Sequence, residues 1–325
     1  MQARSDTAAV RVIAPARLHL GFLDLNGNLG RRYGSIGLAI DRPCTEVIVA
    51  RAATTGASGP EAERATRVLE GLRGRLGIAH HHHAEILQAI PAHAGLGSGT
   101  QLALALGAAL SHLEGQHLGA RLLAEQGARG HRSAIGLAAF TDGGFLVDGG
   151  KGAGSAPPPL LVRLAFPTDW RVILVLDPAA QGVHGEQETE AFARLPPLPA
   201  DQTAHVCRLV MMRLLPGLAE TDLDAFGSAL TEIQQIVGGH FAAAQGGSAW
   251  TSTKVARIVA GLAAAGAVGV GQSSWGPTGF AFVASQSEGE RLYQSAREEA
   301  KALGLQLLIA TGRNAGARLV GSANE

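Results

Sequence analysis

From Pro91 to Leu110 the sequence reads PAHAGLGSGTQLALALGAAL, a glycine-rich turn followed at once by an apolar helix. Glycine alternates with leucine and serine through Gly95–Gly99, so backbone N–H groups are left uncovered by side chains. The helix that follows adds its N-terminal N–H groups, which favour an anion. The stretch has neither the Lys-Ser/Thr ending of a P-loop nor a G-x-G-x-x-G dinucleotide motif. It predicts an anion-binding turn of another kind, with an ordinary strand-to-helix turn as the alternative.

Composition narrows the class of protein. With 325 residues, 46% of them hydrophobic, the chain can form one large or two modest domains with a buried core. The formal net charge is zero, which argues against nucleic acid and membrane partners. Cys44 and Cys207 are far apart, which argues against a disulfide scaffold and a structural zinc site. No signal peptide or long apolar run occurs, so we expect a cytoplasmic protein.

The order of predicted elements indicates an α+β protein of two domains. Strands are predicted at residues 10–15, 45–50, 82–90, 143–148, 170–176, 279–284 and 305–310. Helices are predicted at 59–77, 100–114, 119–130, 205–215, 223–237, 254–265 and 287–303. A Gly/Pro-rich segment at 149–159 places the boundary between domains 1–160 and 161–325. The histidine run at 80–83 is predicted to be a solvated strand edge, with a tag or a metal tract as alternatives.

Three motifs stand in the order found in the GHMP superfamily of small-molecule kinases. They are APARLHLGFLDL at residues 14–25, the turn at 91–101, and GVGQSSWGPTG at 269–279. The middle motif resembles the P-x-x-x-G-L-G-S-S-A loop with which that superfamily wraps nucleotide phosphates. The resemblance implies a ribosomal protein S5 domain 2-like N-terminal domain and a ferredoxin-like C-terminal domain.

A closer resemblance is to the β-ribofuranosylaminobenzene 5′-phosphate synthases, which are non-kinase members of the superfamily. It is carried by LHLGFLDL at 18–25, GRRYGSIGLAID at 30–41 and GLGSGTQ at 95–101, and by the stretches 129–136, 143–150 and 182–188. The family joins phosphoribosyl diphosphate to a para-substituted benzoate and releases carbon dioxide and pyrophosphate, on the way to tetrahydromethanopterin. The resemblance therefore implies these two substrates, with 4-aminobenzoate and 4-hydroxybenzoate both open.

The chain departs from the kinase pattern at the catalytic base. Kinases of the superfamily commonly place a catalytic Asp seven or eight residues before a Gly-Gly pair. Here the corresponding positions before Gly143 are Ile135 and Gly136, which cannot accept a proton. Arg17 stands where several of the kinases have Lys, and Gly99 replaces a magnesium-ligating Ser. We therefore expect a phosphate cradle without ATP as a cosubstrate, and Mg²⁺ bridging the phosphates of the substrate.

The resemblance and the residue types together give the candidate site residues. The expected catalytic residues are Arg17, His19, Asp24, Arg132 and Ser133. The expected substrate-binding residues are Arg31, Arg32, Tyr33, Gly95, Gly97, Ser98, Gly99, Thr100, Gln101, His184, Gln272, Ser273 and Ser274. Of these, Arg31 or Arg32 is expected to hold the 5′-phosphate, because a fork of Arg donors suits a phosphate.

Several of these residues also have a plain structural explanation. Asp24 precedes Asn26-Gly27 and suits a turn. His19 alternates with two leucines and suits a core position, while the arginine pair suits a solvated loop. No metal ligands are assigned.

Two rival functions stay open at this stage. The first is an ATP-dependent kinase of the same superfamily that uses Asp142 or Asp148 as its base. The second is a ligand-binding protein of the same fold without catalysis. The oligomeric state is open as well, with a homodimer as one alternative.

Overall fold

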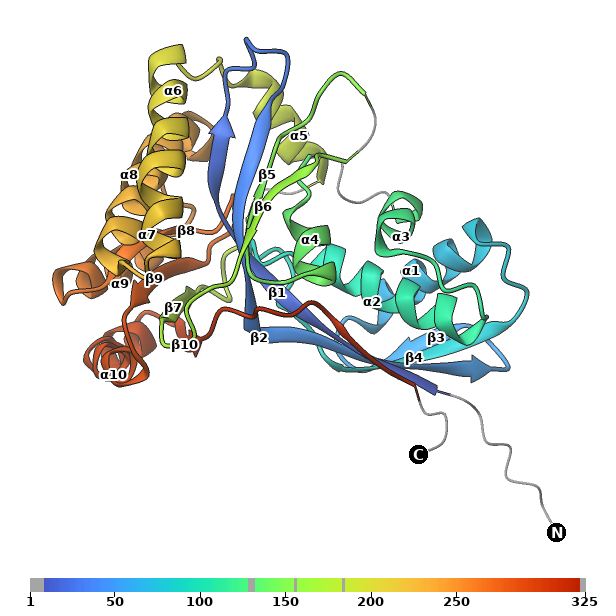
Figure 1. The fold of residues 1–325 in the computed structure, drawn as a ribbon. Helices are drawn as coiled ribbons and strands as arrows, with labels where there is room; N and C mark the ends of the chain where they lie inside the picture. Colours follow the sequence, from blue (N-terminus) through green and yellow to red (C-terminus); the bar gives the residue numbers. More distant parts are fainter. Residues whose placement is uncertain (1–8, 128–131, 155–156, 183–184, 322–325) are drawn as a thin grey trace.

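Two long antiparallel strands run through the middle of the fold (Figure 1). In the computed structural model, which describes residues 9–127, 132–154, 157–182 and 185–321, β1 is Ala9–Asp24 and β2 is Tyr33–Ala52. Both are far longer than the predicted strands at 10–15 and 45–50. In the missed part of β2, Gly34, Gly37 and Pro43 interrupt the alternation of polar and apolar residues on which the prediction depends. The missed part of β1 keeps this alternation from Arg17 to Leu20, so there the prediction was too short.

The first sheet is built around this pair. Its order is β11-β1-β2-β4-β3, and β5 pairs with β2 and with β6. The strands added are β3 (Gly56–Ser58), β4 (His81–Gln88), β5 (Phe145–Asp148), β6 (Leu160–Leu164) and β11 (Arg318–Gly321). The helices α1 (Ala62–Arg75), α2 (Ser98–Leu113), α3 (Ala120–Gln126) and α4 (Ile135–Thr141) lie together on one side of it (Figure 1). The apolar face of α2 packs with the sheet, and Leu104 and Leu106 are fully buried there.

The second sheet has the topology of a ferredoxin-like domain. Its strands are β7 (Arg171–Leu176), β8 (Val268–Gln272), β9 (Gly279–Val283) and β10 (Gln306–Ala310), in the antiparallel order β10-β7-β9-β8. The helices between β7 and β8 are α5 (Gly185–Arg194), α6 (Ala200–Leu209), η1 (Val210–Leu214), α7 (Leu215–Ala219), α8 (Leu223–Phe241), η2 (Ala242–Gln245) and α9 (Thr253–Ala264). Helix α10 (Gln286–Ala302) joins β9 to β10. This arrangement confirms the predicted fold class.

Two strands at or beyond the predicted boundary at residue 160 belong to the first sheet. Strand β6 pairs with β5 directly after residue 159, and β11 returns from the end of the second domain to pair with β1. The register places Val10 opposite Gly321 and Ile13 opposite Arg318. The chain therefore crosses between the two sheets more than once, and the division at residue 160 stays a prediction.

Helix α8 joins the second sheet to β1 through side chains that bond the backbone. The Thr231 hydroxyl accepts the N–H of Val270 at 3.2 Å, and the Gln234 amide oxygen accepts the N–H of Gln272 at 2.8 Å. The Gln234 amide nitrogen donates to the Leu20 carbonyl at 2.7 Å. Helix α8 thereby covers the edge of β8 that no described strand pairs with. Such an edge is commonly covered, because its unpaired N–H and C=O groups could otherwise pair with another chain.

The histidine run lies in the sheet and is not wholly solvated. Strand β4 is flanked by β2 and β3, and its side chains alternate between exposed and buried. His82 is buried and hydrogen-bonds Glu114, which Arg51 and His80 also contact. These bonds lower the pKa of Glu114 to about 2, against the opposing effect of burial. The prediction of a solvated edge was therefore wrong at His82.

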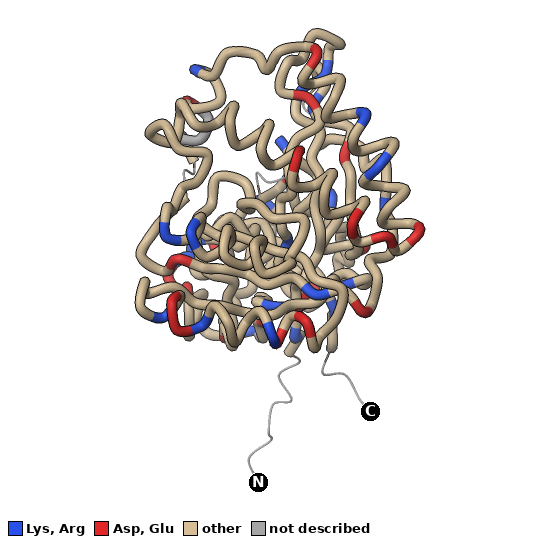
Figure 2. The backbone as a smooth tube through the Cα atoms, turned by 90° about the vertical axis from the view of Figure 1, so that its left-hand side faces the viewer, with Lys and Arg blue, Asp and Glu red and all other residues tan. Residues whose placement is uncertain are grey.

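The surface carries charges of both signs. Lys and Arg lie interspersed with Asp and Glu on the side shown in Figure 2. No helix within the described ranges is long and apolar enough to cross a membrane. That nucleic acid is not a partner stays a prediction.

Asp148 fastens three segments at the N-terminus of α4. One carboxylate oxygen accepts the N–H groups of Ser35 and Gly150, and the other accepts the Ala134 N–H and the Ser133 hydroxyl. Its side chain is fully buried, and burial raises its pKa although each of these hydrogen bonds lowers it. Asp148 is therefore a structural residue, which removes it as a base for the rival kinase function.

The Asp148→Asn variant should be less stable than the wild type by about 3 kcal/mol, because an amide NH₂ would face two donors that now bond a carboxylate. Chemical denaturation measures this change. Asp142→Asn is the matched control, since Asp142 is exposed at the other end of α4 and should leave stability nearly unchanged. Equal stability of the two variants would contradict the role given to Asp148.

Candidate active site

The glycine-rich turn forms an open helix end above a pocket. Gly95 and Gly97 have φ angles of 80° and 81°, in the left-handed region that favours glycine. Gly97 is the N-cap of α2, and no side chain caps this end. The N–H groups of Ser98 and Gly99, in the first turn, are therefore available to an anion. They border a pocket of about 370 Å³, to which Thr100 and Ser274 also contribute.

Three loops meet behind this pocket with almost no side chains between them. A Cβ atom on Gly95 would lie 2.3 Å from the Ser273 carbonyl oxygen, and one on Gly276 would lie 2.4 Å from the Ala94 carbonyl oxygen. A Cβ on Gly182 would lie 2.5 Å from the Trp275 carbonyl oxygen. Only glycine fits at these points, so the cradle of the first domain and the third motif of the second domain are in direct backbone contact.

Two arginines line the pocket. Arg17, on β1, donates from its guanidinium to the Gly95 carbonyl at 2.6 Å and lies against Gly97. Arg64, on α1, is half-buried and 3.5 Å from Glu61. Of the described residues that line this pocket, none is Asp or Glu. The pocket thus combines backbone donors with two cations, as an anion with several charges requires.

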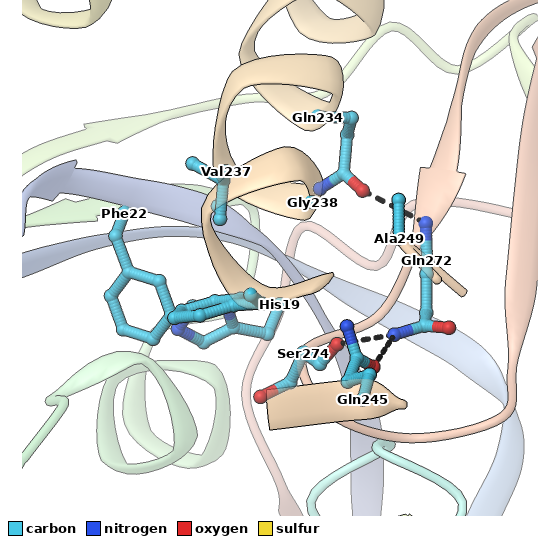
Figure 3. Close-up of a pocket in the computed structure, with 11 residues that line it drawn as sticks. His19, Phe22, Gln234, Val237, Gly238, Gln245, Ala249, Gln272 and Ser274 are labelled. Atoms are coloured by element: carbon cyan, nitrogen blue, oxygen red, sulfur yellow. Dashed lines mark hydrogen bonds between the residues drawn. The ribbon is translucent and has the colours of Figure 1, made fainter. Parts of the chain in front are cut away.

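The third motif is pinned to both β1 and the cradle. The Ser273 hydroxyl accepts the His19 N–H at 3.0 Å and donates to the Gly95 carbonyl at 2.7 Å. Ser273 is fully buried, so its hydroxyl holds the loops in place. Gln272 donates to the Ser274 carbonyl and to Gln245 (Figure 3).

His19 lies two residues after Arg17 in β1, so both side chains are on the same face of the strand. A bulge between His19 and Gly21 turns Phe22 onto that face, where its ring centroid lies 4.4 Å from the His19 ring. Burial, together with the charges of Arg17 and Arg132, lowers the pKa of His19 to about 3. The imidazole is therefore neutral at physiological pH and does not act as an ordinary acid.

An aromatic cluster forms around Trp275 of the third motif. Trp275 packs on Phe241 at 4.3 Å and on Phe192 at 5.3 Å between ring centroids. The Arg132 guanidinium lies over the Phe192 ring at 4.6 Å. Trp275 and Phe241 are buried and Phe192 is half-buried, so the cluster is an apolar region next to the third motif.

Another group of expected residues gathers at the far end of the β1-β2 hairpin. Asp24 accepts the N–H groups of Asn26 and Gly27 through one carboxylate oxygen, as its turn position suggests. Arg31 donates to the carbonyls of Gly149 and Gly150. Neither Asp24 nor Arg31 lines the cradle pocket.

Arg32 and Tyr33 line a separate pocket of about 240 Å³ with Phe192 and His240. Burial lowers the pKa of His240. Since the Arg31 guanidinium already bonds two carbonyls, Arg32 is the better placed of the pair to hold a phosphate. That role stays a prediction.

The remaining expected residues lie behind the pocket or outside the described chain. Gln101 is buried and donates to the Gly136 carbonyl at 2.8 Å, while Ser133 bonds Asp148. His184 lies outside the described residues. Sequence reasoning missed Arg64 and His93, both of which line the cradle pocket. Nothing near Arg64 in the sequence distinguishes it from the other arginines of its helix.

The Arg64→Leu variant should bind inorganic pyrophosphate more weakly by about 1–2 kcal/mol, because a half-buried cation at the pocket wall is lost. Titration calorimetry measures the affinity. Arg67→Leu is the control, because Arg67 is exposed on the same helix and does not line the pocket. An unchanged affinity in Arg64→Leu would show that the cradle binds without it.

Comparison with known proteins agrees with this geometry. The GHMP kinases N terminal domain matches residues 63–144, and the GHMP kinases C terminal domain matches residues 214–302. A homoserine kinase from Cytophaga hutchinsonii has a similar structure, with a TM-score of 0.64 and 19% identity over 98% of this chain and 99% of that one. A mevalonate diphosphate decarboxylase from Enterococcus faecalis has a TM-score of 0.64 and 16% identity over 97% and 99% of the two chains. At such identities these structures show the fold alone.

Curated relatives are more similar in sequence. The chain is 36% identical over 239 residues to the beta-ribofuranosylphenol 5′-phosphate synthase of Archaeoglobus fulgidus, covering 70% of this chain and 76% of that protein. It is 33% identical over 331 residues to the enzyme of the same name from Methanothermobacter thermautotrophicus, covering 94% and 97%. With the cradle, the ferredoxin-like second domain and this identity over nearly the whole length, the chain belongs to the beta-ribofuranosylphenol 5′-phosphate synthase family.

Proposed function

We propose that the protein transfers the ribosyl phosphate of phosphoribosyl diphosphate to a para-substituted benzoate with loss of the carboxylate. A carbon–carbon bond forms between C1 of the ribose and the ring carbon that bears the carboxylate. The bond from C1 to the diphosphate oxygen breaks, and carbon dioxide leaves the ring while its electron pair restores aromaticity. The name of the relatives, which refers to a ribosylphenol, supports 4-hydroxybenzoate as the acceptor, with 4-aminobenzoate as the alternative.

The observation that carries the proposal is that no described residue lining the cradle pocket could serve as the base of a kinase. Ile135, where kinases of the superfamily place their base, is buried against Gly37 of β2. Gly136, the neighbouring candidate position, lies directly against Thr100, so no side chain reaches the cradle from there. The site thus offers donors to a leaving diphosphate but, among the described residues lining it, no carboxylate to deprotonate an alcohol.

The cradle would stabilise the departing diphosphate. Negative charge develops on its bridging oxygen as the C1 bond breaks, and fixed donors act most strongly on charge that develops in the transition state. The open N-terminus of α2 and the guanidinium groups of Arg17 and Arg64 supply those donors. The cation that forms at C1 needs protection from water, and Trp275, the member of the aromatic cluster that lines the cradle pocket, would give it.

Magnesium fits this site as a partner of the substrate. The hydroxyls of Ser98 and Thr100 line the pocket and are hard oxygen ligands, while the diphosphate and water would supply the rest. Bound there, Mg²⁺ would neutralise charge on the leaving group.

The proposed reaction is tested with phosphoribosyl diphosphate and carboxyl-labelled 4-hydroxybenzoate or 4-aminobenzoate, in the presence of Mg²⁺ and without ATP. We expect labelled carbon dioxide and pyrophosphate in equal amounts, because one of each leaves in every turnover. Scintillation counting of trapped gas and a pyrophosphate assay measure them.

The rival functions give different results in the same experiment. Carbon dioxide release that needs ATP, or ATP consumption driven by an alcohol acceptor, would support the kinase. Binding of phosphoribosyl diphosphate with no release under any of these conditions would support a non-catalytic ligand-binding protein.

A further inference from the structure

Three polar side chains around one pocket have no hydrogen-bond partner among the described residues. They are Arg32, Tyr33 and His240, and the pocket of about 240 Å³ that they line lies between the end of the β1-β2 hairpin, α5 and the end of α8. Arg32 is exposed, while Tyr33 and His240 are half-buried, so a ligand in the pocket has access to all three. Their donors are therefore available to a bound group.

The charges around this pocket suit an anion. Arg32 carries a permanent positive charge, and the Tyr33 hydroxyl and one ring nitrogen of His240 can each donate a hydrogen bond. No described residue that lines the pocket is Asp or Glu. Asp24, a carboxylate of the same hairpin, accepts two backbone N–H groups of its own turn. The other lining residues are apolar side chains of the hairpin, of α5 and of the segment after α5.

Arg32 differs from its neighbour Arg31 in what its guanidinium contacts. Arg31 donates to two backbone carbonyls, at 2.7 and 2.6 Å. The Arg32 side chain instead folds across Gly27, where a Cβ atom would lie 2.4 Å from the Arg32 Nε. Gly27 thus makes room for Arg32, so the hairpin turn directs this side chain without occupying its donors.

Tyr33 is held in an unfavourable backbone conformation. Its φ angle is 76°, in the left-handed region that a bulky residue rarely adopts. The ring packs edge-on against Phe192, at 5.4 Å between ring centroids, and Phe192 lines the same pocket. Strain of this kind is kept mainly at functional sites, where the side chain is needed in that place.

This pocket and the cradle pocket border the same pair of rings. Phe192 lines this pocket, Trp275 lines the cradle pocket, and their ring centroids are 5.3 Å apart. Phosphoribosyl diphosphate has a diphosphate at one end of its ribose and a monophosphate at the other. The cradle offers a helix N-terminus and two arginines, whereas this pocket offers one arginine and two neutral donors. The smaller set of donors suits the group with the smaller charge.

We propose that this pocket is a phosphate-monoester site, in which Arg32 pairs with the phosphate and Tyr33 and His240 donate hydrogen bonds to it. The inference rests on the proposed function, because it gives the 5′-phosphate of the donor substrate its place. It adds His240 to the substrate-binding residues. A phosphate monoester has a charge of about −1.5 to −2 and three acceptor oxygens, which match one cation and two further donors.

The test is direct binding of ribose 5-phosphate, which does not depend on turnover. Calorimetry measures its affinity, with ribose as the ligand that lacks the phosphate. Arg32→Leu should weaken binding roughly tenfold or more, because a charge-assisted bond is lost, and Tyr33→Phe and His240→Leu should weaken it less. His240→Gln, which keeps a donor, should retain part of the affinity. Arg194→Leu is the matched control, because Arg194 bonds Glu190 at the exposed end of α5 and does not line the pocket.

Pyrophosphate distinguishes the two sites in the same assay. Arg32→Leu should leave its affinity unchanged, while Arg64→Leu should weaken pyrophosphate and leave ribose 5-phosphate unchanged. Phosphoribosyl diphosphate should lose affinity in both variants, because it carries both groups. Ribose 5-phosphate should still bind when pyrophosphate is saturating, since the two ligands occupy separate pockets.

An unchanged affinity for ribose 5-phosphate in an Arg32→Leu variant whose thermal unfolding is intact would overturn the assignment. So would the absence of binding in the wild type, or competition between ribose 5-phosphate and pyrophosphate. Loss of 4-hydroxybenzoate binding in Arg32→Leu, with normal affinity for ribose 5-phosphate, would show that the pocket holds a carboxylate instead. Failure of carbon dioxide release with the expected binding pattern would reject the proposed reaction and leave the phosphate site standing.

The ionisation of His240 supplies an independent measurement. Burial lowers the pKa of His240, and a bound phosphate would raise it, because a nearby negative charge favours the imidazolium. Arg32 and Tyr33 are the other titratable groups among the described residues that line the pocket. An NMR pH titration of ¹⁵N-histidine-labelled protein should show this rise with ribose 5-phosphate and not with ribose. His205, which bonds Glu232 outside the pocket, is the internal control. A His240 pKa that ribose 5-phosphate leaves unchanged would contradict the inference.

Discussion

The close approach of three backbones at Gly95, Gly182 and Gly276 is the constraint on which the site depends. Each of these glycines lies where an added Cβ would come within about 2.5 Å of another loop's backbone. The loops belong to both domains, so this contact sets the position of the third motif against the cradle. Ser273 fixes it further, because its hydroxyl bonds β1 on one side and the cradle on the other. A side chain at any of the three glycines would clash with the backbone of the facing loop and displace the third motif.

The site divides into a rigid part and a more exposed part. The rigid part is the cradle with His19, where backbone contacts and buried hydroxyls leave little freedom. The exposed part is the end of the β1-β2 hairpin, where Arg31 and Arg32 are both exposed. Preorganised donors suit a leaving group whose charge develops during the reaction, while an exposed end can admit and release a substrate.

The fold class and the family were predictable from the sequence, because the requirement for glycine in the cradle is local. The turn at 91–101 and the helix after it are recognised from neighbouring residues alone, and helix α2 begins at Ser98, two residues before its predicted start. The full length of β1 and β2 was not predicted, although residues 16–24 and 33–40 pair with each other as a local hairpin. The part of β2 at residues 36–38 is also held by β5 at residues 145–147, a contact that no local pattern predicts. The role of Ser273 depends on the same kind of contact, over 254 residues to His19. Arg64 reaches the pocket because of how α1 packs in the fold, and no pattern in the neighbouring sequence predicts that packing.

Strand β11 has a consequence for how the protein is made. Residues 318–321 supply the strand that pairs with β1 over Val10–Ile13, so the first sheet is completed by residues that follow every strand of the second sheet in the sequence. Until they leave the ribosome, β1 keeps an open edge, which is prone to pairing with other chains. The N-terminal domain is therefore not a unit that finishes folding while the second domain is still being translated.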